Sequence, residues 1–273
     1  MAVEPHGPFQ VSAATHRGLV RASNEDTIAV GEWLGAGERA ELTTVLAGAA
    51  LMPLIVADGL GGHRGGDIAS RFLVEQLLER VHLFAEDTLE VAKALTEIDA
   101  ALVAQMLERP DLQGMGSTLA AAFVSTDTLT IINVGDSRVY LTDVQGGFRQ
   151  VSIDDVPARS FQGFESDTLG LNHAGRPRSH SVTQAFGGSS PKRRQLQPHI
   201  FRMPSPKSAW SMLLCSDGLT DLVQEQALRD ALSSPLLDAA KLVEMALESG
   251  GTDNISVILV RHGAGSKAQN PTG

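Results

Sequence analysis

The sequence has 273 residues, of which 42% are hydrophobic and 20% are charged, a balance that suits one large domain with a substantial core. The formal net charge of −10 disfavours nucleic acid and anionic membranes as partners, because the summed field repels phosphate groups. The longest apolar run, residues 45–57, is shorter than the ~20 residues of a membrane helix and contains a proline, so we expect no membrane span.

The first residues, MAVEPHGPFQV, lack the basic start and apolar run of a secretory signal, and the chain has a single cysteine. We therefore expect a cytoplasmic protein without a disulfide framework. No sequence period repeats along the chain, which excludes solenoids and propellers. Residues 1–263 are expected to form a single catalytic domain, and the polar residues 264–273 to form a flexible tail.

Two kinds of periodicity alternate along the chain. Short runs rich in Val, Ile, Leu and Thr, bounded by Gly, Asp or Asn, predict strands at residues 9–15, 51–57, 118–124, 129–134, 138–142, 210–215 and 254–260. Segments with helical spacing of apolar residues predict helices at residues 66–86, 89–107, 224–232 and 236–248.

The connections between the predicted strands indicate the fold class. Runs 118–124, 129–134 and 138–142 are separated by only a few residues, which permits antiparallel hairpins and forbids parallel crossovers. The helices fall in two separate blocks, which favours an α+β fold with helical layers outside mainly antiparallel sheets. Residues 152–190 show no periodicity, and we expect a long surface flap there.

Four aspartates share one kind of position, where an apolar strand meets a tight turn that contains glycine: Asp58 in LIVADG, Asp136 in INVGDS, Asp217 in LLCSDG and Asp253 in GGTDN. A strand end fixes the backbone, and glycine lets it approach closely, so a carboxylate there projects over the sheet edge at low conformational cost. One Asp-Gly pair is usually only a turn. Four such positions together predict a cluster of carboxylates.

Oxygen-only carboxylate clusters suit Mg²⁺ or Mn²⁺ better than Zn²⁺. Two such ions activate a shared water and stabilise both oxygens of an in-line displacement at phosphorus, so hydrolysis of a phosphate ester is the natural reaction. A substrate phosphate also favours a bidentate guanidinium, and Arg21 lies four residues before Glu25 in GLVRASNED.

Six segments in order make a resemblance specific: GLVRASNED, VADGLGGHRGGDIAS, GMGSTL, INVGDSRVYL, LLCSDGLTDLV and GGTDNISVILV. They resemble the motifs of the metal-dependent type 2C serine/threonine protein phosphatases, in their compact bacterial form, and run from residue 18 to residue 260. The resemblance implies an αββα sandwich, two antiparallel sheets flanked by helices. It also implies hydrolysis of phosphoserine and phosphothreonine by a metal-activated water.

The resemblance assigns the metal site by motif. Asp58 would bridge the two cations, Mn²⁺ or Mg²⁺, and the Gly59 carbonyl would bind one of them. Asp217 and Asp253 would complete the other site. Glu25, with its neighbour Asp26, would support the ion on the Gly59 side, mainly through coordinated water.

Further roles and departures follow from the same motifs. Arg21 would bind the substrate phosphate, and Asp136 would contribute with Asp217 to a weaker third ion. Eukaryotic members carry a histidine directly after the Asp-Gly pair, and this chain has Leu60 at that position. For the nearby His63 we expect a structural role. The family pattern Thr-x-Asp-His-Ser corresponds to SIDDV from Ser152, which keeps an acidic residue but lacks the histidine.

The implied partner is a phosphorylated protein whose phosphate a serine/threonine kinase attaches, and we expect the phosphatase to act as a monomer. Two alternatives stay open. One is a catalytically impaired, phosphoprotein-binding regulator, which the unusual flap suggests. The other is a phosphatase of small phosphorylated metabolites, which would need a deeper pocket than a protein phosphatase does.

Overall fold

The structure is a computed structural model that describes residues 8–46, 51–61, 65–142, 147–157, 182–188 and 195–263. The predicted tail, residues 264–273, and most of the predicted flap, residues 158–181 and 189–190, lie outside the described residues.

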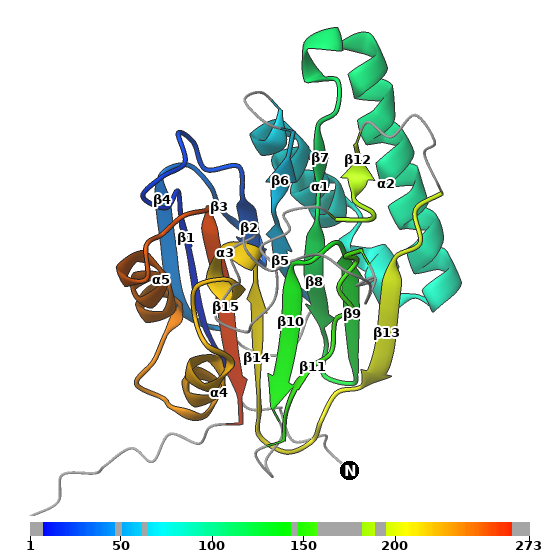
Figure 1. The fold of residues 1–273 in the computed structure, drawn as a ribbon. Helices are drawn as coiled ribbons and strands as arrows, with labels where there is room; N and C mark the ends of the chain where they lie inside the picture. The colour runs from blue at the N-terminus through cyan, green and yellow to red at the C-terminus, as the bar shows by residue number, and fades with distance from the viewer. Residues whose placement is uncertain are drawn as a thin grey trace, which may run out of the picture.

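Two large antiparallel sheets form the centre of the molecule (Figure 1). The first has the strand order β11-β10-β14-β15-β1-β4, and the second has the order β13-β9-β8-β5-β2-β3. The first consists of β1 (Phe9–His16), β4 (Arg39–Leu46), β10 (Arg138–Thr142), β11 (Phe148–Gln150), β14 (Trp210–Cys215) and β15 (Ile255–His262). The second consists of β2 (Thr27–Val30), β3 (Trp33–Gly35), β5 (Met52–Ala57), β8 (Leu119–Val124), β9 (Thr128–Val134) and β13 (His199–Pro204).

Helices cover the outer faces of both sheets (Figure 1). The second sheet is covered by α1 (Gly66–Glu79), η1 (Val81–Ala85), α2 (Thr88–Glu108) and η2 (Pro110–Leu112). The first is covered by α3 (Asp217–Thr220), α4 (Glu225–Ser233) and α5 (Ala239–Glu248). The predicted αββα sandwich is thus confirmed. In the described part of the chain, no helix has the length and apolar character needed to cross a bilayer.

Three apolar layers result, and strand alternation assigns side chains to them. Ile258 of β15 faces the other sheet, where it shares a core with Leu54 of β5. Its neighbours Val257 and Leu259 face the opposite way and pack with α4 and α5. This period of two buries both faces of a central strand, which explains why β15 reads as a continuous apolar run.

The structure corrects the expected hairpin between residues 129–134 and 138–142. These segments are β9 and β10, and they belong to different sheets. The residues between them cross from one sheet to the other beside the predicted site. By contrast, β8 and β9 do form an antiparallel hairpin.

Several elements differ from the sequence expectation. The helix predicted at residues 66–86 ends at Glu79, and a short 3-10 helix follows. The sequence patterns do not predict β2, β3, β4 or β13. The edge strand β4 alternates exposed and half-buried residues and carries charged side chains, so its apolar signal is weak. A third, small sheet of β12 (Phe186–Gly187), β7 (Gly116–Ser117) and β6 (Gly59–Leu60) lies beside the site.

Candidate metal centre

The residues that the motifs assign to the site line one pocket with a volume of about 180 Å³, except Asp26, which is not part of its lining. It forms where loops next to strands of both large sheets meet. Its lining comprises Arg21, Glu25, Asp58, Gly59, Leu60, Gly61, Asp136, Val182, Asp217, Asp253 and Asn254. The four aspartates predicted to converge are therefore neighbours in space.

Asp58 lies between the buried strand β5 and the short strand β6. Thr118 holds its backbone: the Thr118 N–H donates to the Asp58 carbonyl at 2.9 Å, and the Asp58 N–H donates to Thr118 Oγ1 at 3.3 Å. At Gly59, a Cβ would collide with the Gly66 carbonyl and lie 2.5 Å from the carbonyl oxygen of Glu25. Only glycine allows this approach, which leaves the backbone beside Asp58 open to a ligand.

Glu25 is fixed from two directions. A Cβ on Gly66, the first residue of α1, would lie 2.8 Å from Cδ of Glu25, so the carboxyl group packs directly on the helix start. The Glu25 N–H donates to Asn254 Oδ1 at 2.8 Å. Asn254 Nδ2 also donates to the carbonyls of Arg17 at 2.8 Å and Ser23 at 2.9 Å. One asparagine thereby joins the loop before β15 to the loop that carries Glu25.

Asp217 begins α3 directly after β14. The preceding Ser216 donates its hydroxyl to Asp26 Oδ2 at 2.9 Å. A Cβ on Gly218 would collide with the carbonyl of Asn254, so glycine is required where α3 approaches the loop before β15. Asp217 and Asp253 thus belong to segments in direct contact.

Arg21 contacts the carboxylate of Asp253. Its Nη2 donates to Asp253 Oδ2 at 2.6 Å, and the Arg21 side chain is 45% exposed, compared with 17% for Asp253. The other oxygen of Asp253 accepts the Asn254 N–H at 2.8 Å. The guanidinium therefore lies at the solvent side of the carboxylate cluster, where a phosphate could reach it.

Asp136 occupies the turn that crosses from β9 to β10. Gly135 has φ of +92°, and a Cβ there would lie 2.7 Å from Thr118 Cγ2. The Thr118 hydroxyl also shares a hydrogen bond of 2.7 Å with Ser137 Oγ. Thr118 therefore contacts both the Asp58 backbone and the turn that carries Asp136.

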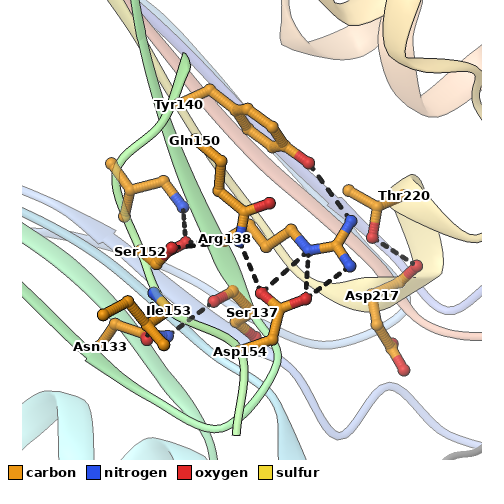
Figure 2. A network of polar contacts seen from close by, with 11 residues as sticks. Asn133, Ser137, Arg138, Tyr140, Gln150, Ser152, Ile153, Asp154, Asp217 and Thr220 are labelled. Atoms are coloured by element: carbon orange, nitrogen blue, oxygen red, sulfur yellow. Dashed lines mark hydrogen bonds and ion pairs between the residues drawn. The ribbon is translucent and has the colours of Figure 1, made fainter. Parts of the chain in front are cut away.

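A polar network anchors the start of β10, directly after Asp136 (Figure 2). Arg138 donates to Asp154 Oδ2 through Nε at 3.0 Å and Nη2 at 2.7 Å, and to the Tyr140 hydroxyl at 3.3 Å. Gln150 Nε2 donates to Asp154 Oδ1 at 2.7 Å. The Arg138 and Asp154 side chains are only 13% and 12% exposed, so this forked ion pair is shielded from solvent.

The carboxylates raise one another's pKa. Burial raises the pKa of Asp58 well above its usual range, and the charges of Asp26 and Asp217 add to the effect. Burial, followed by the charge of Asp217, raises the pKa of Asp136 to about 7. Burial and the Asp217 charge also raise the pKa of Asp253. The cluster holds more negative charge than its surroundings neutralise, and bound cations would remove this repulsion.

The chemistry of the site fits hard divalent cations. Its potential ligands are oxygens, and no cysteine or histidine is found among the described residues that line it. Asp26 Oδ1 is buried and has no hydrogen-bond partner within the described segments. Burial also raises the pKa of Asp26 to about 7. A water molecule held by an ion would supply the missing donor.

Across the described ranges, no three acidic, histidine or cysteine side chains lie close enough together to form a group for one metal. Within the pocket, Arg21 instead pairs with Asp253 at 2.6 Å.

The structure also locates the departures from the family pattern. Leu60 lines the pocket at the position of the eukaryotic histidine, and His63 lies outside the described residues. Where the pattern has a histidine after Asp154, this chain has Asp155. Its Oδ1 accepts a hydrogen bond of 2.9 Å from Nε2 of His199, which begins β13. The imidazole next to Asp155 is thus that of His199, which belongs to β13 and does not follow Asp154 in the chain.

Three residues of the site were missed by sequence reasoning: Thr118, Ser216 and Asn254. All three are buried polar side chains that connect site segments through hydrogen bonds. Each lies within one of the motifs GMGSTL, LLCSDG and GGTDN. A polar residue inside such a motif is the sequence signal that could have identified them.

Comparison with known sequences identifies relatives of the chain. A sequence model of the protein phosphatase 2C family matches residues 40–247. The serine/threonine protein phosphatase PstP of Mycobacterium tuberculosis is 33% identical over 260 residues, which cover 92% of this chain and 44% of that protein. This chain thus spans less than half the length of that relative. The serine/threonine phosphatase stp of Listeria welshimeri is 32% identical over 267 residues, which cover 94% of this chain and 97% of that protein.

Solved structures show the same fold. The Mycobacterium tuberculosis phosphatase PstP/Ppp superposes with a TM-score of 0.68 at 27% identity, covering 93% of this chain and 98% of that chain. A catalytic domain of PstP in complex with two manganese ions superposes with a TM-score of 0.67 at 29% identity, covering 93% of this chain and 99% of that chain.

Proposed function

Because this chain belongs to the protein phosphatase 2C family, we propose that it is a metal-dependent protein phosphatase that hydrolyses phosphoserine and phosphothreonine. The cofactors are two divalent cations, Mn²⁺ or Mg²⁺. The observation that carries the proposal is the convergence of Asp58, Asp217 and Asp253 with Arg21 on one pocket. The family relative that binds two manganese ions supports the same metal requirement.

Each carboxylate has a binding task. Asp58 would serve both ions, the Gly59 carbonyl and Glu25 would support one of them, and Asp217 and Asp253 would hold the other. When bound, the two cations lower the pKa of water and neutralise charge on the phosphate. The rigid backbone around Asp58 and Gly59 keeps these ligands in place, because Thr118 and the glycine contacts leave little freedom there.

Arg21 binds and orients the substrate phosphate. Its guanidinium is partly exposed and lies 2.6 Å from Asp253. Arg21 would bind two phosphate oxygens, which have a spacing and charge similar to those of the Asp253 carboxylate. Leu60 has no proton to give to the leaving alkoxide, so it cannot take the role of the eukaryotic histidine.

The size of the pocket favours a protein substrate over a small metabolite. Pockets that enclose small molecules have volumes of about 300–1,000 Å³. The pocket here has a volume of about 180 Å³, enough for ions and a phosphate but not for the body of a metabolite. This size supports a substrate whose phosphate enters the pocket and whose remainder lies on the surface, as a phosphorylated polypeptide does.

A binding protein without catalysis is the second candidate, and the structure offers less support for it. Such a regulator needs a phosphate-binding arginine but has no need for the carboxylates of Asp58, Asp217 and Asp253 around one pocket. Burial raises the pKa values of Asp58 and Asp253, and the Asp217 charge adds to both, which supports a role for these carboxylates in binding cations.

The proposal is tested by hydrolysis of p-nitrophenyl phosphate and of a phosphothreonine peptide, with Mn²⁺ and with excess chelator. We expect turnover of both substrates that the chelator abolishes. Asp58→Asn should lower turnover by at least about 100-fold and weaken Mn²⁺ binding, as loss of a metal-orienting group does. Near-normal rates of Asp58→Asn in saturating Mn²⁺ contradict the assignment.

Asp127→Asn is the matched control. Asp127 is exposed in the β8–β9 turn, at the opposite end of the sheet from Asp58. This variant should behave as the wild type. If no Mn²⁺-dependent turnover occurs while phosphopeptide still binds, the regulator is the correct function.

The finer assignments are part of the same proposal. Asp136, with Asp217, would bind a weaker third ion. The substrates are proteins phosphorylated by a serine/threonine kinase, and the enzyme acts as a monomer. A cytoplasmic location is supported by the lone cysteine, Cys215, which is a buried free thiol.

A further inference from the structure

One residue outside the pocket connects three segments around it. Asp155 and Gly135 exchange two hydrogen bonds: the Asp155 N–H donates to the Gly135 carbonyl at 2.9 Å, and the Gly135 N–H donates to Asp155 Oδ2 at 2.9 Å. The other carboxylate oxygen accepts His199 Nε2 at 2.9 Å. The Asp155 carbonyl accepts the Thr183 N–H at 2.7 Å. All the polar groups of this residue are thus engaged.

Two of the three contacted segments lead to the pocket. Gly135 precedes Asp136, and Thr183 follows Val182, and both Asp136 and Val182 line the pocket. On its other side, the Gly135 turn packs on Thr118, which holds the backbone of Asp58. The turn is therefore clamped between Asp155 and Thr118.

Gly135 itself offers no side chain for positioning the turn. With φ of +92°, its backbone occupies a region that other residues avoid, so hydrogen bonds to its N–H and carbonyl must hold it. Asp155 supplies a partner to each. His199 in turn fixes the carboxylate, because an imidazole N–H on one oxygen directs the other oxygen at Gly135.

A purely structural role for this pair is the weaker explanation. The side chains of His199 and Asp155 are 27% and 11% exposed, and a single hydrogen bond contributes only about 0.5–1.5 kcal/mol to stability. Strand β13 is already paired with β9 over its whole length, from His199 to Pro204. The pair therefore adds little to the attachment of β13, whereas it is directly bonded to the Asp136 turn.

We propose that Asp155 and His199 are positioning residues of the metal centre, which set the place of the Asp136 turn and of Val182 relative to Asp58. They touch neither substrate nor ion. The inference rests on the proposed function, because the consequence is expected in metal-dependent turnover. It also predicts a change in the ion-free protein that does not depend on activity.

Two substitutions of His199 separate hydrogen bonding from bulk. In His199→Gln the amide nitrogen lies as many bonds from Cβ as Nε2 does, so it can still donate to Asp155. In His199→Asn the side chain is one bond shorter and cannot reach. His82→Asn is the control, because His82 is exposed in η1, in the helical layer over the second sheet.

The first measurement is hydrogen exchange at the Gly135 amide in the ion-free protein. Exchange should be several-fold faster in His199→Asn than in the wild type, and Gln should restore it. Asp155→Ala should show the largest increase, and its melting temperature establishes whether it remains folded. Equal Gly135 exchange in wild type and His199→Asn overturns the clamp, whatever the activity.

The second measurement is the Mn²⁺ dependence of p-nitrophenyl phosphate hydrolysis. His199→Asn should raise the Mn²⁺ concentration for half-maximal activity about 10-fold or more, as loss of a group that orients metal ligands does. KM at saturating Mn²⁺ should be unchanged, since Arg21 is not affected. A wild-type Mn²⁺ dependence in His199→Gln supports the positioning role of His199. An equal defect in His199→Gln, or a change in KM alone, contradicts that role. Absence of wild-type turnover refutes the proposed function and leaves the exchange test standing.

Discussion

At the scale of single residues, two side chains with different proposed tasks, Arg21 and Asp253, contact each other in the pocket. Arg21 donates to Asp253 at 2.6 Å, so a phosphate-binding cation and a metal-binding anion neutralise each other. Burial lowers the pKa of Arg21, but Asp253, and to a lesser extent Asp58 and Asp217, raise it above its usual value. The guanidinium thus neutralises part of the negative charge of this cluster.

Replacing Arg21 should therefore separate phosphate binding from ion binding. In Arg21→Ala we expect KM for p-nitrophenyl phosphate to rise by about 10-fold or more, because a charge-assisted hydrogen bond contributes ~1.5–3 kcal/mol. Affinity for Mn²⁺ should stay equal or increase, since a competing cation is removed. Steady-state kinetics and calorimetric titration measure the two effects.

Arg39→Ala is a suitable control for this variant. Arg39 lies on the edge strand β4, where it is 59% exposed and pairs with Glu41, away from the pocket lining. It should leave KM unchanged. A KM for Arg21→Ala that matches that of Arg39→Ala means that another group binds the phosphate.

At the scale of elements, the long helix α2 shows how local sequence contributes stability without touching the site. Asp87 caps its first turn: Oδ1 accepts the N–H groups of Leu89 at 2.8 Å and Glu90 at 3.1 Å. These donors have no partner inside the helix, and the negative charge also suits the helix dipole. The apolar face of α2 then packs on the second sheet through residues such as Ile98 and Leu102.

Asp87→Ala should lower the free energy of unfolding by about 1 kcal/mol, which corresponds to a fall of roughly 2–4 °C in melting temperature for a chain of this size. Asp87→Ser should recover most of the loss, because serine also caps. The specific activity of both folded variants should equal that of the wild type. Thermal denaturation checks the first expectation, and a reduced kcat in Asp87→Ala would show that α2 affects the site.

At the scale of the whole molecule, the pocket joins the two sheets. Asp58 follows β5 of the second sheet, whereas Asp217 follows β14 and Asp253 precedes β15 of the first sheet. A pair of ions held by these residues would cross-link the sheets at one end of the sandwich. Ion binding should therefore be coupled to global stability.

We expect Mn²⁺ to raise the melting temperature. At a concentration of 100 times Kd, a ligand specific for the folded state adds about 2.7 kcal/mol, equivalent to about 5 °C or more here. Asp58→Asn should lose most of this shift, whereas Asp127→Asn should retain it. Differential scanning calorimetry with and without chelator measures the effect, and an equal shift in both variants would place the stabilising ions elsewhere.

Strong, local patterns made much of the fold predictable. Buried central strands such as β5 and β15 are continuous apolar runs, and α2 and α5 show helical spacing, so their sequence ranges agree with the structure within a few residues. Edge elements were not predictable in this way. Strands β4 and β13 are only half-buried, and their side chains carry little apolar periodicity.

The sequence by itself determined the family and the acidic residues of the site, because Asp58, Asp136, Asp217 and Asp253 stand in motifs whose glycines and strand flanks are local properties. Only the tertiary structure decided that β9 and β10 lie in different sheets, that Arg21 pairs with Asp253, and that His199 contacts Asp155. These contacts join residues far apart in the chain. Their partners are selected by the packing of one sheet on the other, and no local pattern records that choice.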